Sequence, residues 1–262
     1  MNKIWMYLVG VAAMLTACDP QIDHYDIGEA ITPEQLNVDV TPIIVNGKNS
    51  NKVVVSNNSP VLGLWDNGIV TSNKKADTLL MIAKGAQNIQ FTVLNADGSK
   101  FTKNFPVNID ELSFPVPAEW GLLCGETGKT WVWATDNPYG AGALYGNGPA
   151  SATFPEWWQV KVDEMRGWGL LYDEITFDLN GGCNYTLVQK GQDGSDNIVV
   201  KDKFILNPTS KTLQTVEGTP FVRKVNVTIH NIVRLSENEL TLTIPDGGNR
   251  EVFMFKRKGY EY

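Results

Sequence analysis

Histidine is scarce in this sequence, and that scarcity excludes several kinds of catalytic and metal site. The two histidines, His24 and His230, are far apart along the chain. A histidine-rich metal site or a Ser-His-Asp triad needs such side chains to converge with their partners. We therefore expect neither kind of site, and we assign no catalytic residue.

Cysteine is also rare, with three residues at Cys18, Cys124 and Cys183. Cys124 and Cys183 could pair in an oxidising compartment, but a sequence does not give the Cα separation that a disulfide requires. We expect two buried thiols, and the disulfide stays open as the alternative.

Basic residues are in the minority, with 22 Lys and Arg against 29 Asp and Glu, for a net charge of −7. Binding to a phosphate backbone needs clustered basic side chains, so nucleic acid is not expected as a partner. Residues 125–130 (GETGKT) match a phosphate-binding loop only in part. Leu123 stands where that loop requires glycine, and a strand pattern follows instead of a helix. Nucleotide binding is therefore rejected.

Long apolar runs are missing beyond the first residues of the chain. The one such run, residues 4–17, is shorter than the roughly 20 apolar residues of a transmembrane helix and fits the core of a secretory signal. Residues 15–18 (LTAC) are typical of a lipobox, in which a cysteine becomes the first mature residue and takes a diacylglycerol thioether. We expect a lipoprotein signal peptide over residues 1–17, a lipidated Cys18 and a polar tether over residues 18–36.

Short strand patterns occupy the first half of the remaining chain. Ile89, Phe91 and Val93 alternate with polar residues and lead into a turn at residues 95–98 (NADG). Alternation with a period of two, punctuated by Gly, Asn and Asp, is typical of antiparallel strands with one solvated face. Residues 37–112 therefore predict an immunoglobulin-like β-sandwich.

Two prolines, Pro115 and Pro117, interrupt the strand pattern and mark a domain boundary, because proline removes a ladder donor. Residues 118–262 then return to alternating apolar positions, with at most one helical turn expected within residues 155–165. We expect an antiparallel β-sandwich or a lipocalin-like meander barrel for this C-terminal domain. The whole chain is thus predicted to be all-β.

Several short segments together resemble one group of proteins. They are residues 128–133 (GKTWVW), 140–142 (GAG), 155–158 (PEWW), 174–181 (EITFDLNG) and 232–242 (IVRLSENELTL), with residues 64–68 (LWDNG) in the first half. They resemble surface lipoproteins of gut bacteria of the Bacteroidetes type, in which a PKD-like or Ig-like domain lies between the lipid anchor and an all-β domain. Because members resemble components of polysaccharide-uptake systems, the resemblance implies glycan capture. The WDNG segment departs from the PKD pattern, since it lacks a downstream companion strand containing tyrosine.

Aromatic residues are concentrated between residues 120 and 168. Sugars present apolar C–H faces ringed by hydroxyl groups, so a glycan site needs flat aromatic platforms with polar neighbours. The candidate glycan-binding residues are Tyr139, Tyr145, Trp157, Trp158, Trp131, Trp133, Asp136 and Asn137. Trp131 and Trp133 lie two apart and share a sheet face, where a core role is the alternative. One of the adjacent Trp157 and Trp158 is also expected in the core.

The acidic residues give no catalytic pair at the required spacing. Glu174 and Asp178 share a strand face, but four residues separate their backbones by about 13 Å, whereas glycosidases need carboxyl groups about 5–5.5 or 6.5–9.5 Å apart. Acids from other strands stay open as an alternative. Residues 193–197 (DGSDN) could offer oxygen ligands to calcium, but they also fit an ordinary hairpin turn, so no cofactor or metal is assigned.

These patterns predict a lipid-anchored outer-membrane protein, on the cell surface or on the periplasmic face. The expected function is non-catalytic binding of a polysaccharide or oligosaccharide, with other outer-membrane uptake proteins as further partners. A glycoside hydrolase or lyase on the same β-domain is one alternative. A structural, adhesion or membrane-acting envelope protein is the other, because a fold alone does not separate these functions.

Overall fold

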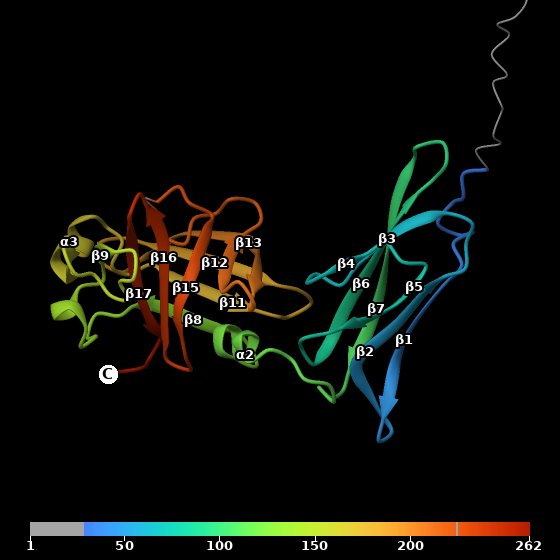
Figure 1. The fold of residues 1–262 in the computed structure, drawn as a ribbon, viewed down its shortest axis with the longest axis horizontal. Helices are drawn as coiled ribbons and strands as arrows, with labels where there is room; N and C mark the ends of the chain where they lie inside the picture. Colours follow the sequence, from blue (N-terminus) through green and yellow to red (C-terminus); the bar gives the residue numbers. More distant parts are fainter. Residues whose placement is uncertain (1–28, 224) are drawn as a thin grey trace, which may run out of the picture.

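The computed structural model describes residues 29–223 and 225–262. Strands dominate this part of the chain, so the all-β prediction is confirmed (Figure 1). The predicted signal peptide, Cys18 and His24 lie outside the described residues. Among the described residues, no helix has the length and apolar character needed to cross a bilayer.

Two antiparallel sheets form the first domain. The three-stranded sheet has the order β1–β2–β5 and the four-stranded sheet has the order β4–β3–β6–β7. The strands are β1 (Val38–Val45), β2 (Lys48–Asn57), β3 (Leu62–Asp66), β4 (Thr71–Ser72), β5 (Ala76–Leu80), β6 (Gly85–Leu94) and β7 (Lys100–Ile109). Buried aliphatic and aromatic side chains from both sheets make one core.

The WDNG segment supplies the centre and one turn of this domain. The Trp65 ring is fully buried, and its centroid lies 4.1 Å from that of Phe91. A Cβ at the neighbouring Gly63 would lie 2.0 Å from the Phe91 ring, so only glycine lets β3 approach it this closely. The Asn67 side-chain oxygen accepts the backbone N–H groups of Ile69 and Val70, which forms the turn into β4.

The connection between the domains is fixed by one buried amide. Asn51 on β2 donates from its side chain to the carbonyl oxygens of Met81 and Phe114. Its side-chain oxygen accepts the N–H of Phe114 at 2.9 Å. Pro117 then precedes helix α2 (Ala118–Cys124), a short helix that the sequence pattern did not predict.

Eight of the described strands of the second domain close into an antiparallel barrel. Their order is β8–β11–β12–β13–β14–β15–β16–β17, and β17 pairs back with β8. Of the two predicted architectures, the structure therefore has the meander barrel. The strands are β8 (Lys129–Trp133), β11 (Glu174–Asp178), β12 (Asn184–Lys190), β13 (Asp196–Asn207), β14 (Thr212–Thr215), β15 (Ile229–Leu235), β16 (Glu239–Asp246) and β17 (Asn249–Arg257).

Two short strands extend the sheet along the part of β17 that does not pair with β8. Strand β9 (Tyr145–Pro149) pairs with the first half of β17, and β10 (Gln159–Val160) pairs with β9. The 3-10 turn η1 (Gly140–Gly142) precedes β9. Helix α3 (Val162–Gly167) follows β10. It overlaps the end of residues 155–165, where one helical turn was predicted.

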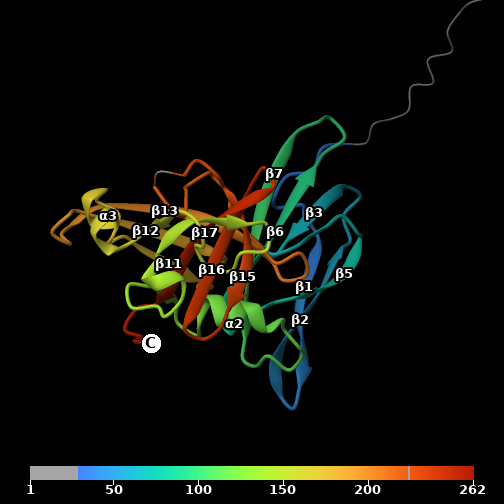
Figure 2. The ribbon, with the colours of Figure 1, turned by 60° about the vertical axis from the view of Figure 1, so that its left-hand side comes forward.

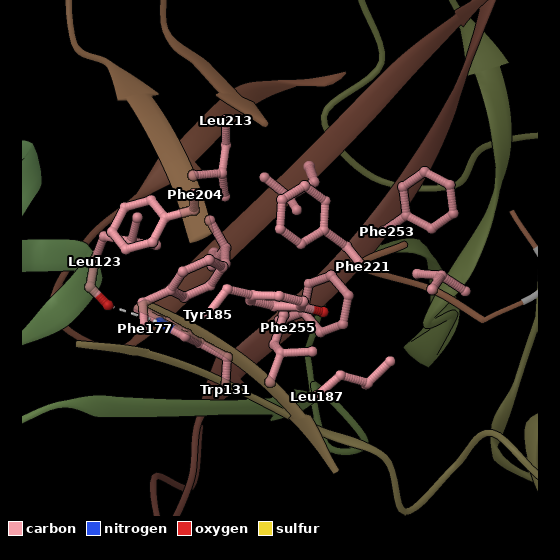
Figure 3. Close-up of a cluster of buried hydrophobic side chains, with 14 of the residues drawn as sticks. Leu123, Trp131, Phe177, Tyr185, Leu187, Phe204, Leu213, Phe221, Phe253 and Phe255 are labelled. Carbon is pink, nitrogen blue, oxygen red and sulfur yellow. Dashed lines mark hydrogen bonds between the residues drawn. The ribbon is translucent and has the colours of Figure 1, made fainter. Parts of the chain in front are cut away.

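Large side chains fill the interior of the barrel (Figure 3). An eight-stranded barrel is just wide enough for its inward side chains to meet. The labelled interior residues are Leu123, Trp131, Phe177, Tyr185, Leu187, Phe204, Leu213, Phe221, Phe253 and Phe255. Cys124 and Cys183 are free and buried, which confirms the prediction of two buried thiols.

The two ends of the barrel are covered by different elements. The indole N–H of Trp131 donates to the carbonyl oxygen of Leu123 in α2, whereas that of Trp133 donates to Leu170 after α3. The α2 end faces the first domain, because Ile82 of that domain joins the barrel core. In both ribbon views α3 lies on the side of the barrel away from the first domain (Figures 1 and 2). We call this the far end of the barrel.

Candidate ligand-binding site

Trp131 and Trp133 are core residues, which corrects their place among the ligand candidates. They share a sheet face as predicted, but that face is the barrel interior, where both rings are buried. Trp133 also stacks on Phe255, with ring centroids 4.6 Å apart. Both indole N–H groups are already satisfied by backbone carbonyls, so neither ring offers a free face or a free donor to a sugar.

Asp136 and Asn137 hold the chain after β8 in place. Asn137 is buried, and its side-chain amide donates to the carbonyl oxygens of Ala134 and Ala143. Asp136 accepts from the Lys256 ammonium at 2.5 Å. Burial alone raises the pKa of Asp136, but the contacts with Lys256 and with the backbone N–H of Tyr262 together outweigh it, so the pKa is lowered. Both polar candidates therefore have partners within the protein. The prediction that Asn137 offers its amide group to a ligand is wrong, because that group is buried and already hydrogen-bonded.

Tyr139 belongs to a separate set of contacts. Its ring centroid lies 6.4 Å from that of Phe154, and the Arg234 guanidinium lies 4.1 Å from the Tyr139 ring centroid. Tyr262 meets the same ring edge-on. These neighbours pack the 134–154 segment against the outside of β17, where Val252 and Met254 are buried. Tyr139 is thus half-buried and already contacts three side chains of the protein.

Three aromatic rings gather at the far end of the barrel, and we call them the ring cluster: Tyr145, Trp158 and Trp168. The Tyr145 centroid lies 5.1 Å from that of Trp158 and 6.4 Å from that of Trp168. The centroids of Trp158 and Trp168 are 6.2 Å apart. The cluster therefore joins β9, the start of β10 and the residue after α3.

Two of the three rings of this cluster are exposed to solvent, and Tyr145 is half-buried. Trp158 is 47% exposed and Trp168 is 36% exposed, and the neighbouring Trp157 is 59% exposed. Large contiguous apolar groups are seldom left on the surface of a soluble domain unless they contact a ligand or partner. Since both Trp157 and Trp158 are exposed, the prediction that one of them fills the core is wrong.

Polar groups lie beside the ring cluster on the same face of the sheet. Tyr145 and Asn147 are two apart on β9, so their side chains project to one side, and Glu251 is the partner of Asn147 on β17. The Tyr145 hydroxyl donates to Glu251 at 2.5 Å. Burial first, and then this carboxylate, raise the pKa of Tyr145, so the phenol stays protonated. The second Glu251 oxygen and the Asn147 amide group are suited to sugar hydroxyls.

Glycine and asparagine shape the loop that carries Trp157 and Trp158. The carbonyl oxygen of Asn147 accepts the N–H groups of Glu156 and Trp157, and its side-chain oxygen accepts the N–H of Trp158. A Cβ at Gly146 would lie 1.8 Å from the Trp158 carbonyl oxygen, so this close crossing requires glycine. The glycine-rich sequence thus places the tryptophan pair over β9.

Three members of the site escaped the sequence analysis: Trp168, Glu251 and Asn147. Trp168 falls in the aromatic stretch, but only the turn of α3 brings its ring back to Trp158. Glu251 reaches Tyr145 through the pairing of β9 with β17, which are far apart in sequence. The sequence did hold one signal for Glu251. It lies two residues before the apolar Phe253, and residues two apart on a strand share a face, so an acidic side chain was to be expected beside Phe253.

The carboxylates once considered for catalysis are engaged elsewhere. Glu174 contacts the ammonium groups of Lys190 and Lys258 at 2.9 and 2.7 Å. Asp178 accepts from the side chain of Asn184. In the proposed calcium loop, Asp193 accepts from the N–H and hydroxyl of Ser195, as in an ordinary turn. Within the described residues, no group of three or more acidic, histidine or cysteine side chains is arranged to hold a metal.

Comparison with known proteins adds no relative, since no protein-family model and no curated protein matches this chain.

Proposed function

We propose that this protein is a lipid-anchored envelope protein whose barrel domain binds polysaccharide or oligosaccharide at the ring cluster without cleaving it. The observation that carries the proposal is the gathering of exposed Trp158 and Trp168 around Tyr145. Aromatic faces stack on the C–H faces of sugars, and the neighbouring Asn147 and Glu251 supply hydrogen-bonding groups.

The position of the cluster supports capture of an external ligand. Trp168 directly follows α3, and α3 lies on the side of the barrel away from the first domain (Figures 1 and 2). The expected tether and lipid anchor precede that first domain in the sequence. The chain would therefore hold the first domain near the membrane and present the cluster outward.

The acidic residues favour binding over hydrolysis. A general acid in a glycosidase needs a raised pKa and a second carboxylate at a set distance. Burial alone would raise the pKa of Glu174, but hydrogen bonds from Lys258 and Lys190 outweigh it and lower the pKa. Asp173 has a raised pKa through burial, but its oxygens accept from Arg223.

A polysaccharide screen on residues 19–262 tests the proposal. We expect retention of at least one glycan with no release of reducing ends. Trp158→Ala and Trp168→Ala should each weaken binding about tenfold or more, a typical effect of truncating a central aromatic contact. Tyr262→Ala is the matched control, because Tyr262 is 37% exposed, close to Trp168 at 36%, but packs against Tyr139 instead.

The outcomes separate the candidate functions. Reducing-end release would replace binding by catalysis. Retention that is unchanged in both tryptophan variants would move the site elsewhere on the protein. Absence of binding to every glycan tested would leave an adhesion, structural or membrane-acting role.

A further inference from the structure

The three rings of the cluster are tilted steeply against one another. Tyr145 makes interplanar angles of 71° with both Trp158 and Trp168. Trp158 and Trp168 differ by 41°. No two of the three rings are coplanar, so the cluster is angled and does not form a flat strip.

Contacts below the cluster hold the tilt of Tyr145 in place. Its ring stacks on Phe253 inside the barrel, with centroids 4.9 Å apart and an interplanar angle of 9°. Its hydroxyl is tied to Glu251. A ring fixed at its face and at its tip does not rotate to meet a ligand without breaking one of these contacts.

Hydrogen bonds also hold the backbone at Trp158 and at Trp168. The N–H of Trp158 donates to the side-chain oxygen of Asn147, and its carbonyl oxygen accepts the N–H of Asn147. The N–H of Trp168 donates to Glu164 at the end of α3. The fold thus holds the backbones of both tryptophans, and Phe253 and Glu251 hold the Tyr145 ring.

A ring arrangement of this kind favours free glycan chains over the flat surface of a crystalline polysaccharide. Only one of several tilted rings can lie flat on the plane of a crystalline polysaccharide, so a crystal face would meet a single stacking contact. A free chain can place different faces of a sugar residue, or of two adjacent residues, against differently oriented rings. The small footprint, with all three centroids within 6.4 Å of one another, suits a short stretch of chain.

We propose, on the basis of the glycan-binding function proposed above, that the ring cluster recognises one or two sugar residues of a soluble glycan chain or chain end. It does not adsorb to crystalline polysaccharide. Tyr145 acts as the fixed wall, and Trp158 and Trp168 are the two solvent-exposed rings.

The test compares physical states of neutral glycans on residues 19–262. The soluble probes are xyloglucan, galactomannan, arabinan, mixed-linkage β-glucan and laminarin, measured by affinity electrophoresis. The insoluble probes are microcrystalline cellulose, crystalline chitin and granular starch, measured by depletion from solution. We expect retention by a soluble glycan and at least tenfold weaker adsorption to every crystalline probe.

Each result decides a different claim. Adsorption to a crystalline probe as tight as to the best soluble glycan overturns this inference and leaves glycan binding intact. Binding to neither class overturns both proposals.

A second measurement tests the size of the site and the role of the tilt. Oligosaccharides of one to six units, cut from the bound polysaccharide, should gain affinity up to two or three units and then level off. A continued rise to six units would indicate an extended platform and would overturn the inference. Tyr145→Phe keeps the ring but frees it from Glu251, so it should weaken binding by roughly three- to tenfold, the usual worth of one hydrogen bond. Unchanged affinity in this variant would show that fixing the ring is not required.

Discussion

At the scale of single residues, the barrel interior contains polar groups that pack without hydrogen-bond partners. Both ring nitrogens of His230 and the hydroxyl of Thr215 are buried and unpaired within the described structure. The His230 ring instead meets Phe221 and Phe253 edge-on, with centroids 4.9 and 5.5 Å away. Neutral imidazole tolerates such a site better than imidazolium, because burial penalises the charge.

This burial predicts an acid sensitivity of the fold. Burial lowers the pKa of His230 from 6.5 to about 4 in the folded protein. The unfolded chain therefore takes up the proton first as pH falls, and the free energy of unfolding decreases from pH 6.5 down to pH 4. The loss from this residue is about 3 kcal/mol at most. Above pH 6.5 the residue makes no contribution to the pH dependence.

Urea unfolding at pH 7.5, 6, 5 and 4 measures this effect in the wild type and in His230→Phe. The phenylalanine variant keeps a ring against Phe221 and Phe253 but cannot bind a proton. Its free energy of unfolding should fall less over this interval than that of the wild type. Parallel curves for the two proteins would mean that other groups cause the acid sensitivity.

At the scale of elements, the alternating strands were predictable and the pieces that complete the site were not. The burial of β6 and β11 follows the period of two seen in their sequences. Helices α2 and α3 span seven and six residues, which is too short for a 3.6-residue period to appear. The pairing of β17 with both β8 and β9 depends on tertiary contacts between distant segments. The sequence therefore left a sandwich and a barrel as alternatives, and it did not predict the contact of Glu251 with Tyr145.

The crossing of the tryptophan loop over β9 gives a prediction at this scale. An alanine Cβ at Gly146 would lie 1.8 Å from the Trp158 carbonyl oxygen and 2.9 Å from the Pro155 side chain. Gly146→Ala should therefore displace the loop, cost about 1–3 kcal/mol of stability and weaken glycan binding at least as much as Trp158→Ala. Thermal unfolding and affinity electrophoresis measure the two effects.

Gly121→Ala is the matched control for that substitution. Gly121 lies in α2 at the other end of the barrel, and nothing lies within 4 Å of an added Cβ. Alanine favours a helix by about 1 kcal/mol over glycine, so this variant should be as stable as the wild type or more stable. Wild-type glycan affinity in Gly146→Ala would show that the close crossing does not position Trp158.

At the scale of the whole molecule, outward presentation of the ring cluster depends on an order of parts: anchor, first domain, barrel and exposed ring cluster. The lipidation of Cys18 stays a prediction from the LTAC segment. Mass spectrometry of the native protein should find a chain that begins at Cys18 and carries acyl groups. Cys18→Ala should abolish the acylation and release the protein from the membrane fraction. An unmodified Cys18 with residues 1–17 still attached would contradict the predicted location.

The molecule also has a groove that is an alternative ligand site to the ring cluster. A groove of about 740 Å³ lies where the first domain meets the α2 end of the barrel, lined in part by Ile82, Trp120 and Leu179. Trp120 is buried. Because each region contains tryptophan, one spectroscopic experiment distinguishes them.

The most direct measurement is therefore a titration of 15N-labelled residues 19–262 with the glycan retained in the screen, followed through the indole N–H resonances of the tryptophans. The account predicts that the signals of Trp158 and Trp168 shift with the same saturation curve, while those of Trp131 and Trp133 stay in place. Shifts at Trp120 alone, with Trp158 and Trp168 unmoved at saturation, would contradict it.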